Sequence, residues 1–158
     1  GYPPSVFAML PRLLERTGTS ANGSITAIYT VLVAGGDMDE PIADEVRGIL
    51  DGHIVLSRTL AERGHFPAID VLQSLSRVMP NVTTREHRAA ATHLRELLAA
   101  YERQRDLILL GAYKQGSDRT TDEAIARMDD IRRFVCQPTS EHTPLAEGVS
   151  ALLASFGV

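Results

Sequence analysis

Apolar residues recur at helical spacing in both halves of the chain, and the first half also contains segments whose pattern predicts strands. Two stretches, residues 4–17 and 41–50, are predicted helices. Pro11 interrupts the first and should kink it or weaken one turn. The second opens at Pro41 and closes at Asp51–Gly52. Their apolar positions are Val6, Phe7, Leu10, Leu13 and Leu14 in the first, and Ile42, Val46, Ile49 and Leu50 in the second.

Two further segments of the first half are predicted strands. Residues 24–34 (SITAIYTVLVA) are rich in β-branched residues and nearly uniformly apolar. They do not alternate, which is typical of a strand buried on both faces of a parallel sheet. Residues 53–56 form a short candidate strand, followed by a helix over 57–63 and a loop at 64–67.

From about residue 80 onward the pattern is helical. Thr83 with Glu86 fits a capping box, and Thr120 with Glu123 repeats it. A third helix starts at Thr143–Pro144. These signals predict a helical bundle without any strand between residues 85 and 111. The inward positions are Ala90, Leu94, Leu97, Tyr101 and Ile108, then Ala124, Met128, Ile131 and Val135, then Leu145, Val149, Leu152 and Phe156.

The strands of the first half are too few for a complete sheet. Two strands with helices on them leave the sheet edges open and the faces uncovered. We therefore expect the first half to be part of a larger α/β domain, with its other strands in an N-terminal part of the protein.

Composition disfavours only a few classes of protein. The 158 residues carry a net charge of −4 and are 44% hydrophobic, so no basic field favours nucleic acid or an anionic membrane. Cys136 is the only cysteine, which excludes an intrachain disulfide and fits a reducing compartment. No apolar run is long enough to span a membrane, and the first residues do not form a signal peptide.

Short catalytic motifs are missing from the sequence. There is no G-x-x-x-x-G-K-[ST] phosphate loop, no G-x-S-x-G elbow and no H-E-x-x-H pair. No metal site is expected from the histidines, whose spacing does not suit metal ligands: His53, His65, His87, His93 and His142.

Three residues stay ambiguous on spacing alone. Arg77 follows an apolar stretch just before the helical half, and a surface or ion-pairing role is its simplest interpretation. Phe66, beside Pro67, is either a core aromatic or a ligand-stacking one. Cys136 is expected to be a buried or half-buried residue rather than a nucleophile, because no histidine is placed near it in the sequence.

Long segments of the chain resemble the ATPases of flagellar export and virulence type III secretion, which are themselves similar to the catalytic β-subunit of the rotary ATP synthase. The resemblance covers essentially the whole chain and weakens after about residue 83. It is carried by Tyr2–Arg16 (YPPSVFAMLPRLLER), Gly23–Arg58 (GSITAIYTVLVAGGDMDEPIADEVRGILDGHIVLSR) and Gly64–Met79 (GHFPAIDVLQSLSRVM).

The resemblance implies a fold of the α/β plus α class. Residues 1–82 would be the C-terminal part of a RecA-like nucleotide-binding domain, and residues 83–158 a C-terminal helical domain. The family's phosphate loop with its lysine, its Mg²⁺-binding aspartate and its catalytic glutamate would all lie upstream. The cofactor implied is ATP with Mg²⁺, whose ligands are mostly outside these residues, and no metal site is implied within them.

The resemblance also implies roles for particular residues. Arg77 matches the family's arginine finger, which acts in a neighbouring subunit; Arg58 is the next candidate. Phe66 falls where the β-subunits stack an aromatic on adenine. The opposite wall of that pocket would be Cys136, Gln137, Pro138 and Thr139, with Thr139 in place of an aromatic. A stalk-contacting loop, expected to be exposed and mobile, would contain Gly111, Ala112, Tyr113, Lys114, Gln115 and Gly116 within the segment 111–122.

The function implied is ATP hydrolysis that powers protein export at the bacterial inner membrane. The intact protein would form a cytoplasmic homohexamer peripheral to that membrane, with a central stalk protein, a stator protein, and secretion chaperones with their effectors as partners. An alternative is a non-enzymatic interaction module, which ATP turnover by the purified chain would distinguish. A rotary synthase subunit is disfavoured by YPPSVF and DEPIADEVRGILDGH, while flagellar and virulence systems both remain open.

Overall fold

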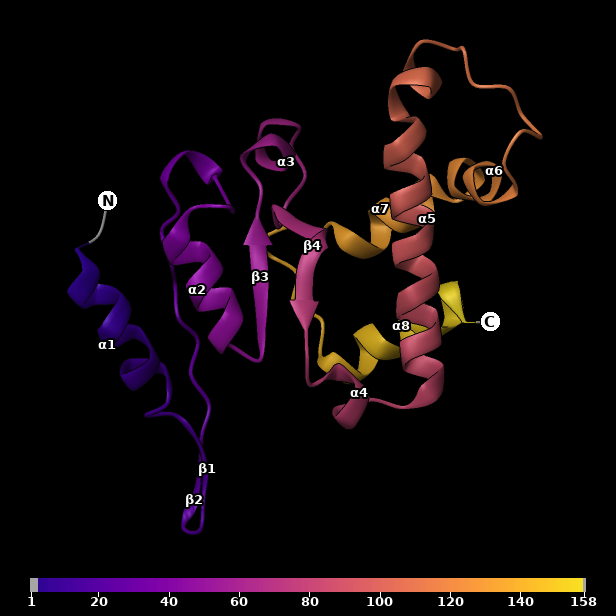
Figure 1. Ribbon diagram of the computed structural model, residues 1–158. Coiled ribbons are helices and arrows are strands. Elements are labelled where there is room, and N and C mark those ends of the chain that lie inside the picture. The colour runs from indigo at the N-terminus through magenta and orange to yellow at the C-terminus, as the bar shows by residue number, and fades with distance from the viewer. Residues whose placement is uncertain (1–2, 158) are drawn as a thin grey trace. The chain divides into compact units, whose positions relative to one another are not determined.

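The computed structural model describes residues 3–157 (Figure 1). The chain forms two compact units, one ending at His53 and the other beginning at Ile54. The α/β plus α class predicted from the sequence is confirmed, because helices and short strands alternate up to residue 76 and only helices follow.

The first unit is built around two helices that begin at prolines. Helix α1 (Pro4–Leu14) and helix α2 (Pro41–Ile49) each carry a proline in the first turn, where its missing N–H costs no hydrogen bond. Pro11 lies inside α1, which continues past it. The two helices pack together, and the buried residues of the unit are Leu14, Ile42, Ala43 and Val46.

The segment between these helices differs from the sequence prediction. Strands β1 (Gly18–Ser20) and β2 (Gly23–Ile25) form a small antiparallel hairpin, and a 3-10 turn, η1 (Ala34–Gly36), precedes α2. Residues 26–33 belong to no strand, and Ile28 is 94% exposed. The predicted buried strand over 24–34 is therefore wrong for this structure, since among residues 3–157 only its start, in β2, is a strand, and that strand pairs only with β1.

The second unit begins with a two-stranded sheet. Strand β3 (Gly52–Leu56) leads into helix α3 (Arg58–Glu62), and the chain returns along strand β4 (Ile69–Ser76), which pairs with β3 (Figure 1). The predicted strand at 53–56 and helix at 57–63 are confirmed. Ser57 caps α3 by accepting the Leu60 N–H, and its own N–H donates to the Ala68 carbonyl at 2.8 Å.

The predicted helical half is confirmed, with changes at helix ends. It comprises α4 (Met79–Val82), α5 (Arg85–Leu109), α6 (Arg119–Ala126), α7 (Met128–Val135) and α8 (Leu145–Phe156). The α5 cap is Thr84, not Thr83, and the α6 cap is Asp118, not Thr120. In each case the side-chain oxygen that accepts a free N–H of the first helical turn belongs to a residue one or two positions from the predicted cap.

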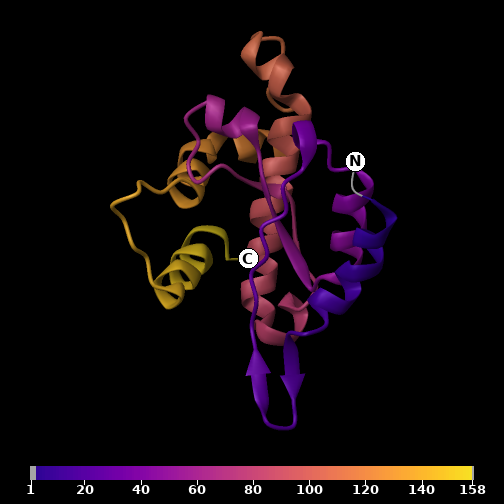
Figure 2. The ribbon, with the colours of Figure 1, turned by 90° about the vertical axis from the view of Figure 1, so that its left-hand side faces the viewer.

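Two other predictions for this half are wrong in detail. The stripe expected to form one helix is split at Arg127, whose backbone (φ −105°, ψ 7°) separates α6 from α7. Leu145 is 83% exposed because it lies at the start of α8, beyond the region that packs on α5. Figure 2 shows the extended segment 136–144, which separates α7 from α8 and carries the chain away from α7 before it returns.

The core of the second unit surrounds the last helix. Helix α5 packs on both α6 and α8, and Phe156 at the end of α8 is fully buried. The Phe134 ring meets the Phe156 ring edge-on at 5.8 Å between centroids. The core residues are Ala90, Leu94, Leu97 and Ala100 from α5, Ala124 from α6, Ile131 from α7, and Leu152 and Phe156 from α8.

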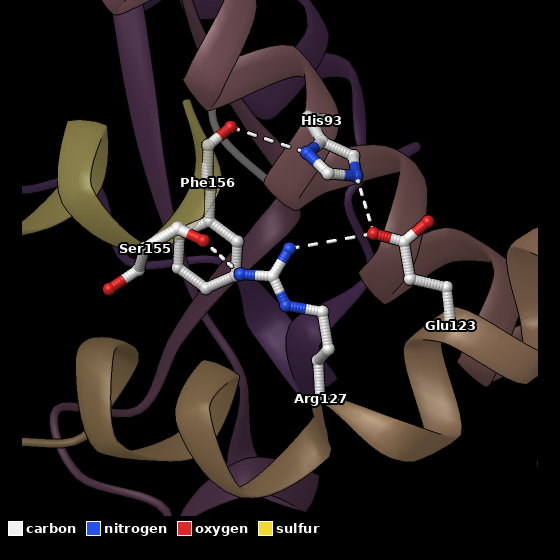
Figure 3. Close-up of polar contacts among 5 residues, drawn as sticks. All are labelled: His93, Glu123, Arg127, Ser155 and Phe156. Atoms are coloured by element: carbon white, nitrogen blue, oxygen red, sulfur yellow. Dashed lines mark hydrogen bonds and ion pairs between the residues drawn. The ribbon is translucent and has the colours of Figure 1, made fainter. Parts of the chain in front are cut away.

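A polar network closes this core (Figure 3). His93 of α5 lies between α6 and α8, with Nδ1 3.2 Å from the Phe156 carbonyl oxygen and Nε2 3.1 Å from Glu123 Oε1. Arg127 donates to Glu123 and to the Ser155 carbonyl, and its guanidinium lies 4.8 Å from the Phe156 ring centroid. The break between α6 and α7 thus places the Arg127 guanidinium where it links α6 and α7 to α8.

The packing predicts which leucines of α5 matter for stability. Leu97 is fully buried and Leu107 is 46% exposed. Leu97→Ala should lower the free energy of unfolding by about 2–5 kcal/mol, since it leaves a cavity in the core. Leu107→Ala, the matched control on the same helix, should change it by less than about 0.5 kcal/mol. Urea unfolding followed by circular dichroism measures both, and equal effects would contradict the packing described here.

Candidate functional site

Arg77 lies at the end of the sheet. It follows the last residue of β4 directly and precedes α4, and its side chain is exposed. The neighbouring residue of the strand, Ser76, is exposed as well. Exposed residues on short connections between regular elements are often binding or catalytic residues, so Arg77 is a candidate by its position.

The predicted adenine-pocket residues come together from distant parts of the sequence. The Gln137 N–H donates to the Phe66 carbonyl at 2.8 Å, which joins the segment after α7 to the loop between α3 and β4. The Phe66 side chain is 54% exposed, so it is not a core aromatic. Cys136 and Gln137 are half-buried, while Pro138 and Thr139 are exposed. The structure thus brings the exposed Phe66 ring beside the segment that follows α7.

A histidine does lie near the cysteine, contrary to the expectation from the sequence. Cys136 Sγ is 3.4 Å from Nδ1 of His65, the residue before Phe66. The two residues are 71 positions apart, so the contact depends on the folding of the segment after α7 against the loop before β4. This contact is a second link between the segment after α7 and the loop before β4, next to the hydrogen bond from the Gln137 N–H.

Phe66 and Arg77 lie at opposite ends of β4. The strand has eight residues, so seven steps of about 3.3 Å separate its ends by at most about 23 Å. Phe66 thus lies before the strand and Arg77 directly after it, at different ends of one element.

The predicted stalk-contacting loop is exposed but internally bonded. Gly111 and Gly116 adopt positive φ values of 68° and 88°, which glycine tolerates without strain. Tyr113 Oη lies 3.1 Å from the Asp118 carbonyl oxygen and 3.0 Å from Asp122 Oδ1, so its single hydrogen lies within reach of both acceptors. The Gly116 N–H donates to Asp122 Oδ2 at 2.8 Å. Ala112, Lys114 and Gln115 project from this frame with exposed side chains.

Two acidic residues hold the loop, and sequence reasoning missed them as site residues. Helix α6 begins at Arg119, so the loop ends earlier than the predicted Asp122. The pKa of Asp118 is lowered, first because the Thr121 hydroxyl donates to its carboxylate. Burial opposes this as the second-largest effect. The N–H groups of Thr120 and Thr121 and the positive charge of Arg103 lower the pKa further. The available signal was the D-x-x-T spacing at a helix start.

Neither a metal cluster nor a spanning helix is found. Within residues 3–157, no three His, Cys, Asp or Glu side chains gather in a way that would hold a metal ion. Among the same described residues, no helix has the length and apolar character needed to cross a membrane.

Two family models together match nearly the whole chain. Residues 1–76 match the ATP synthase alpha/beta family, nucleotide-binding domain, and residues 83–154 match the T3SS EscN ATPase C-terminal domain. The class of protein is therefore a nucleotide-binding α/β domain of the ATP synthase type followed by a helical domain typical of secretion ATPases.

Relatives and solved structures agree with these matches. The flagellum-specific ATP synthase of Bacillus subtilis (strain 168) is 58% identical over 99% of this chain and 36% of its own length. The assembled ATPase EscN of the enteropathogenic E. coli type III secretion system superposes with a TM-score of 0.93 and 48% identity, over 99% of this chain and 38% of that one. EscN in complex with its central stalk EscO gives a TM-score of 0.87 at the same identity, covering 99% and 37%.

The chain belongs to the family of type III secretion and flagellar export ATPases, and it corresponds to their C-terminal region. It spans about a third of the length of the relatives that it matches.

The lowered pKa of Asp118 predicts how stability depends on acid. A depressed pKa in the folded chain means that the ionised carboxylate stabilises the fold above the ordinary aspartate pKa of about 3.9. As the pH falls below that value, the unfolded chain binds the proton first, and the contribution is lost until the pH passes the lowered pKa. Asp118→Asn, which retains a capping oxygen, should therefore lose less stability between pH 5 and pH 2.

The measurement is urea unfolding of the wild type and Asp118→Asn across that pH range. The difference in unfolding free energy between the two should shrink as the pH falls. Curves that stay parallel would show that the Asp118 carboxylate is not specifically stabilised in the fold.

Proposed function

We propose that the full-length protein containing this chain is an ATPase that powers protein export through a type III secretion system. The observation that carries this proposal is the superposition on EscN over 99% of the chain at 48% identity. In this proposal residues 1–82 complete the RecA-like domain and residues 83–158 form the helical domain. Upstream sequence supplies the remaining strands, and with them neighbours for residues 26–33.

Arg77 is proposed as the arginine finger. A phosphoryl group in transfer spreads negative charge over its oxygens, and a planar guanidinium that is always charged meets this charge with paired hydrogen bonds. Its exposed position after β4 supports a reach outside its own unit. The length of β4 between Phe66 and Arg77 supports contacts with two different nucleotides, so that the finger acts on a neighbouring subunit.

Phe66 and the segment 136–139 are proposed to hold the adenine base. The half-exposed ring offers a stacking face, and the Gln137–Phe66 hydrogen bond fixes the two walls relative to one another. Thr139 offers no aromatic face, so stacking occurs on one side only. ATP binds with Mg²⁺, which neutralises the phosphates, and the residues that hold both are mostly upstream.

The oligomer and partners follow from the same family. We propose a homohexamer, peripheral to the bacterial inner membrane, that engages a central stalk, a stator protein, and secretion chaperones with their effectors. The solved complex of EscN with its central stalk EscO supports the stalk in particular. The exposed side chains of Ala112, Lys114 and Gln115, on a loop framed by Tyr113 and Asp122, are proposed to contact it.

A second proposal concerns the 158 residues by themselves. Their sequence contains no phosphate loop, while the helical part has its own buried core. Taken alone, they would act as an interaction module that hydrolyses no ATP above background. Turnover by the purified chain separates this module from an enzyme.

Arg77→Ala in the full-length ATPase should lower kcat by about 10³-fold and leave the KM for ATP nearly unchanged. The reason is that the finger acts where charge develops in the transition state. Arg77→Lys should fail almost as badly, since an ammonium lacks the forked contact. Steady-state hydrolysis by assembled rings measures both variants.

Mixing provides the control for a role across subunits. Arg77→Ala subunits combined with subunits that lack their phosphate-loop lysine but retain Arg77 should regain activity. Near-normal kcat for Arg77→Ala in assembled rings would rule out the finger and make Arg58 the next residue to test.

Phe66→Ala should raise the KM for ATP by about tenfold with little effect on kcat, because base stacking contributes about 1–3 kcal/mol to binding in both ground and transition states. Phe66→Tyr keeps the ring and should behave like the wild type. If Phe66→Ala lowered kcat at unchanged KM, the ring would not be part of the adenine site.

A further inference from the structure

Two arginines of α5 bind the backbone on either side of Arg77. Arg88 and Arg95 are seven residues apart, which is about two helical turns, so they lie on the same face of α5. Both side chains are half-buried, and both donate to main-chain carbonyl oxygens of the segment that precedes α5.

Arg95 holds the strand before Arg77. Its guanidinium donates to the carbonyls of Leu72 and Ser74 at 3.0 and 3.1 Å, and to the carbonyl of Val71. A guanidinium has five N–H donors in a fixed plane, so one side chain can bind several acceptors only when these are themselves fixed in position. The carbonyl groups of this part of β4 are thereby bonded to α5.

The same stretch of β4 is held from its own side as well. Asp70 Oδ1 accepts the N–H groups of Leu72 and Gln73, each at 3.0 Å. Ser74 Oγ accepts the Val55 N–H at 3.0 Å, which ties β4 to β3. Because Arg95 also bonds the carbonyl groups, the backbone polar groups of this part of β4 are bonded largely by side chains. These bonds define the path of the strand backbone.

Arg88 holds the chain after Arg77. Its Nη1 donates to the Pro80 carbonyl at 2.9 Å and to the Thr83 carbonyl at 2.6 Å. Arg77 therefore lies midway between two bonded points, Ser74 and Pro80, each three residues away. Both points are hydrogen-bonded to the same helix, α5, so the backbone of Arg77 is placed relative to α5.

We propose that Arg88 and Arg95 are positioning residues for Arg77: by bonding the chain on both sides of it to α5, they fix where its guanidinium can reach. This inference rests on the proposed finger role of Arg77. A charge that stabilises a transition state must be held in place before the reaction, and a displacement of about 1 Å can cost about 10²-fold in rate.

The test uses assembled rings of the full-length ATPase. Arg95→Met keeps the bulk of the side chain but removes its donors, and it should lower kcat about ten- to hundredfold at an unchanged KM for ATP. Arg95→Lys should recover much of kcat, because an ammonium also donates to carbonyls, whereas Arg77→Lys should not. Arg88→Met should act in the same direction. The matched control is Arg105→Met, whose side chain pairs with Glu102 on the same helix.

Mixed rings separate positioning from a general loss of structure. Arg95→Met subunits have an intact phosphate loop, so partners that lack the phosphate-loop lysine but keep Arg77, Arg88 and Arg95 should restore activity at mixed interfaces. A role of Arg95 in its own nucleotide site or in folding gives no such restoration, and that result would overturn the proposal. Arg88→Met provides the same comparison if Arg95→Met does not assemble.

Arg77→Ala, measured in parallel, distinguishes the finger role of Arg77 from the positioning role of Arg88 and Arg95. Loss of kcat in Arg77→Ala together with normal kcat in both Arg95→Met and Arg88→Met would overturn the positioning role and leave the finger in place. Normal kcat in Arg77→Ala would overturn the finger and the positioning role with it.

Discussion

Helix α5 is the constraint on which the second unit depends. It is 25 residues long, about 37 Å at 1.5 Å per residue, and uninterrupted. One stripe, from Ala90 to Ala100, packs against α6 and α8 and buries Phe156. Another face bonds the carbonyls of β4 through Arg95. A single straight element therefore relates the sheet end, the helical core and the loop after Leu109.

This arrangement explains why the candidate contacts are spread out rather than gathered in one pocket. Phe66 precedes β4, Arg77 follows it, and the loop at 111–116 lies beyond the far end of α5. A chain with its sites at the ends of rigid elements suits a protein that meets several neighbours at once. The proposed ring, with a nucleotide at each subunit boundary and a stalk at its centre, would use each end separately.

Much of this could be predicted from the sequence, and the failures have physical causes. The stripes of α2 and α5 and the strand β3 were found because their apolar spacing is regular. Strand β4 was not identified, because Asp70, Gln73 and Ser74 interrupt its apolar pattern and bond one another or nearby backbone groups. The segment 26–33 was predicted as buried from its composition alone, although burial depends on neighbouring strands.

The contacts around the candidate site are the hardest to predict from the sequence. Thr83 has the capping-box spacing to Glu86 and Thr84 does not, yet the structure places Thr84 at the cap, because its hydroxyl accepts the His87 N–H. The proximity of His65 to Cys136 spans 71 positions and leaves no local pattern. Arg95 resembles any surface arginine of a helix, because its partners are main-chain carbonyls, which every residue has. The role proposed for Arg77 rests on the resemblance of long segments to a family, because its spacing in the sequence points to no particular role.

The most direct test of this account is a structure of the full-length ring, assembled with Mg²⁺, ADP and a planar phosphate analogue of the transition state. We expect the Arg77 guanidinium within hydrogen-bond distance of the analogue bound to the adjacent subunit, with Arg95 and Arg88 still bonded to the carbonyls on either side of it. An Arg77 side chain directed away from every bound analogue, in a ring that is otherwise closed, would contradict it.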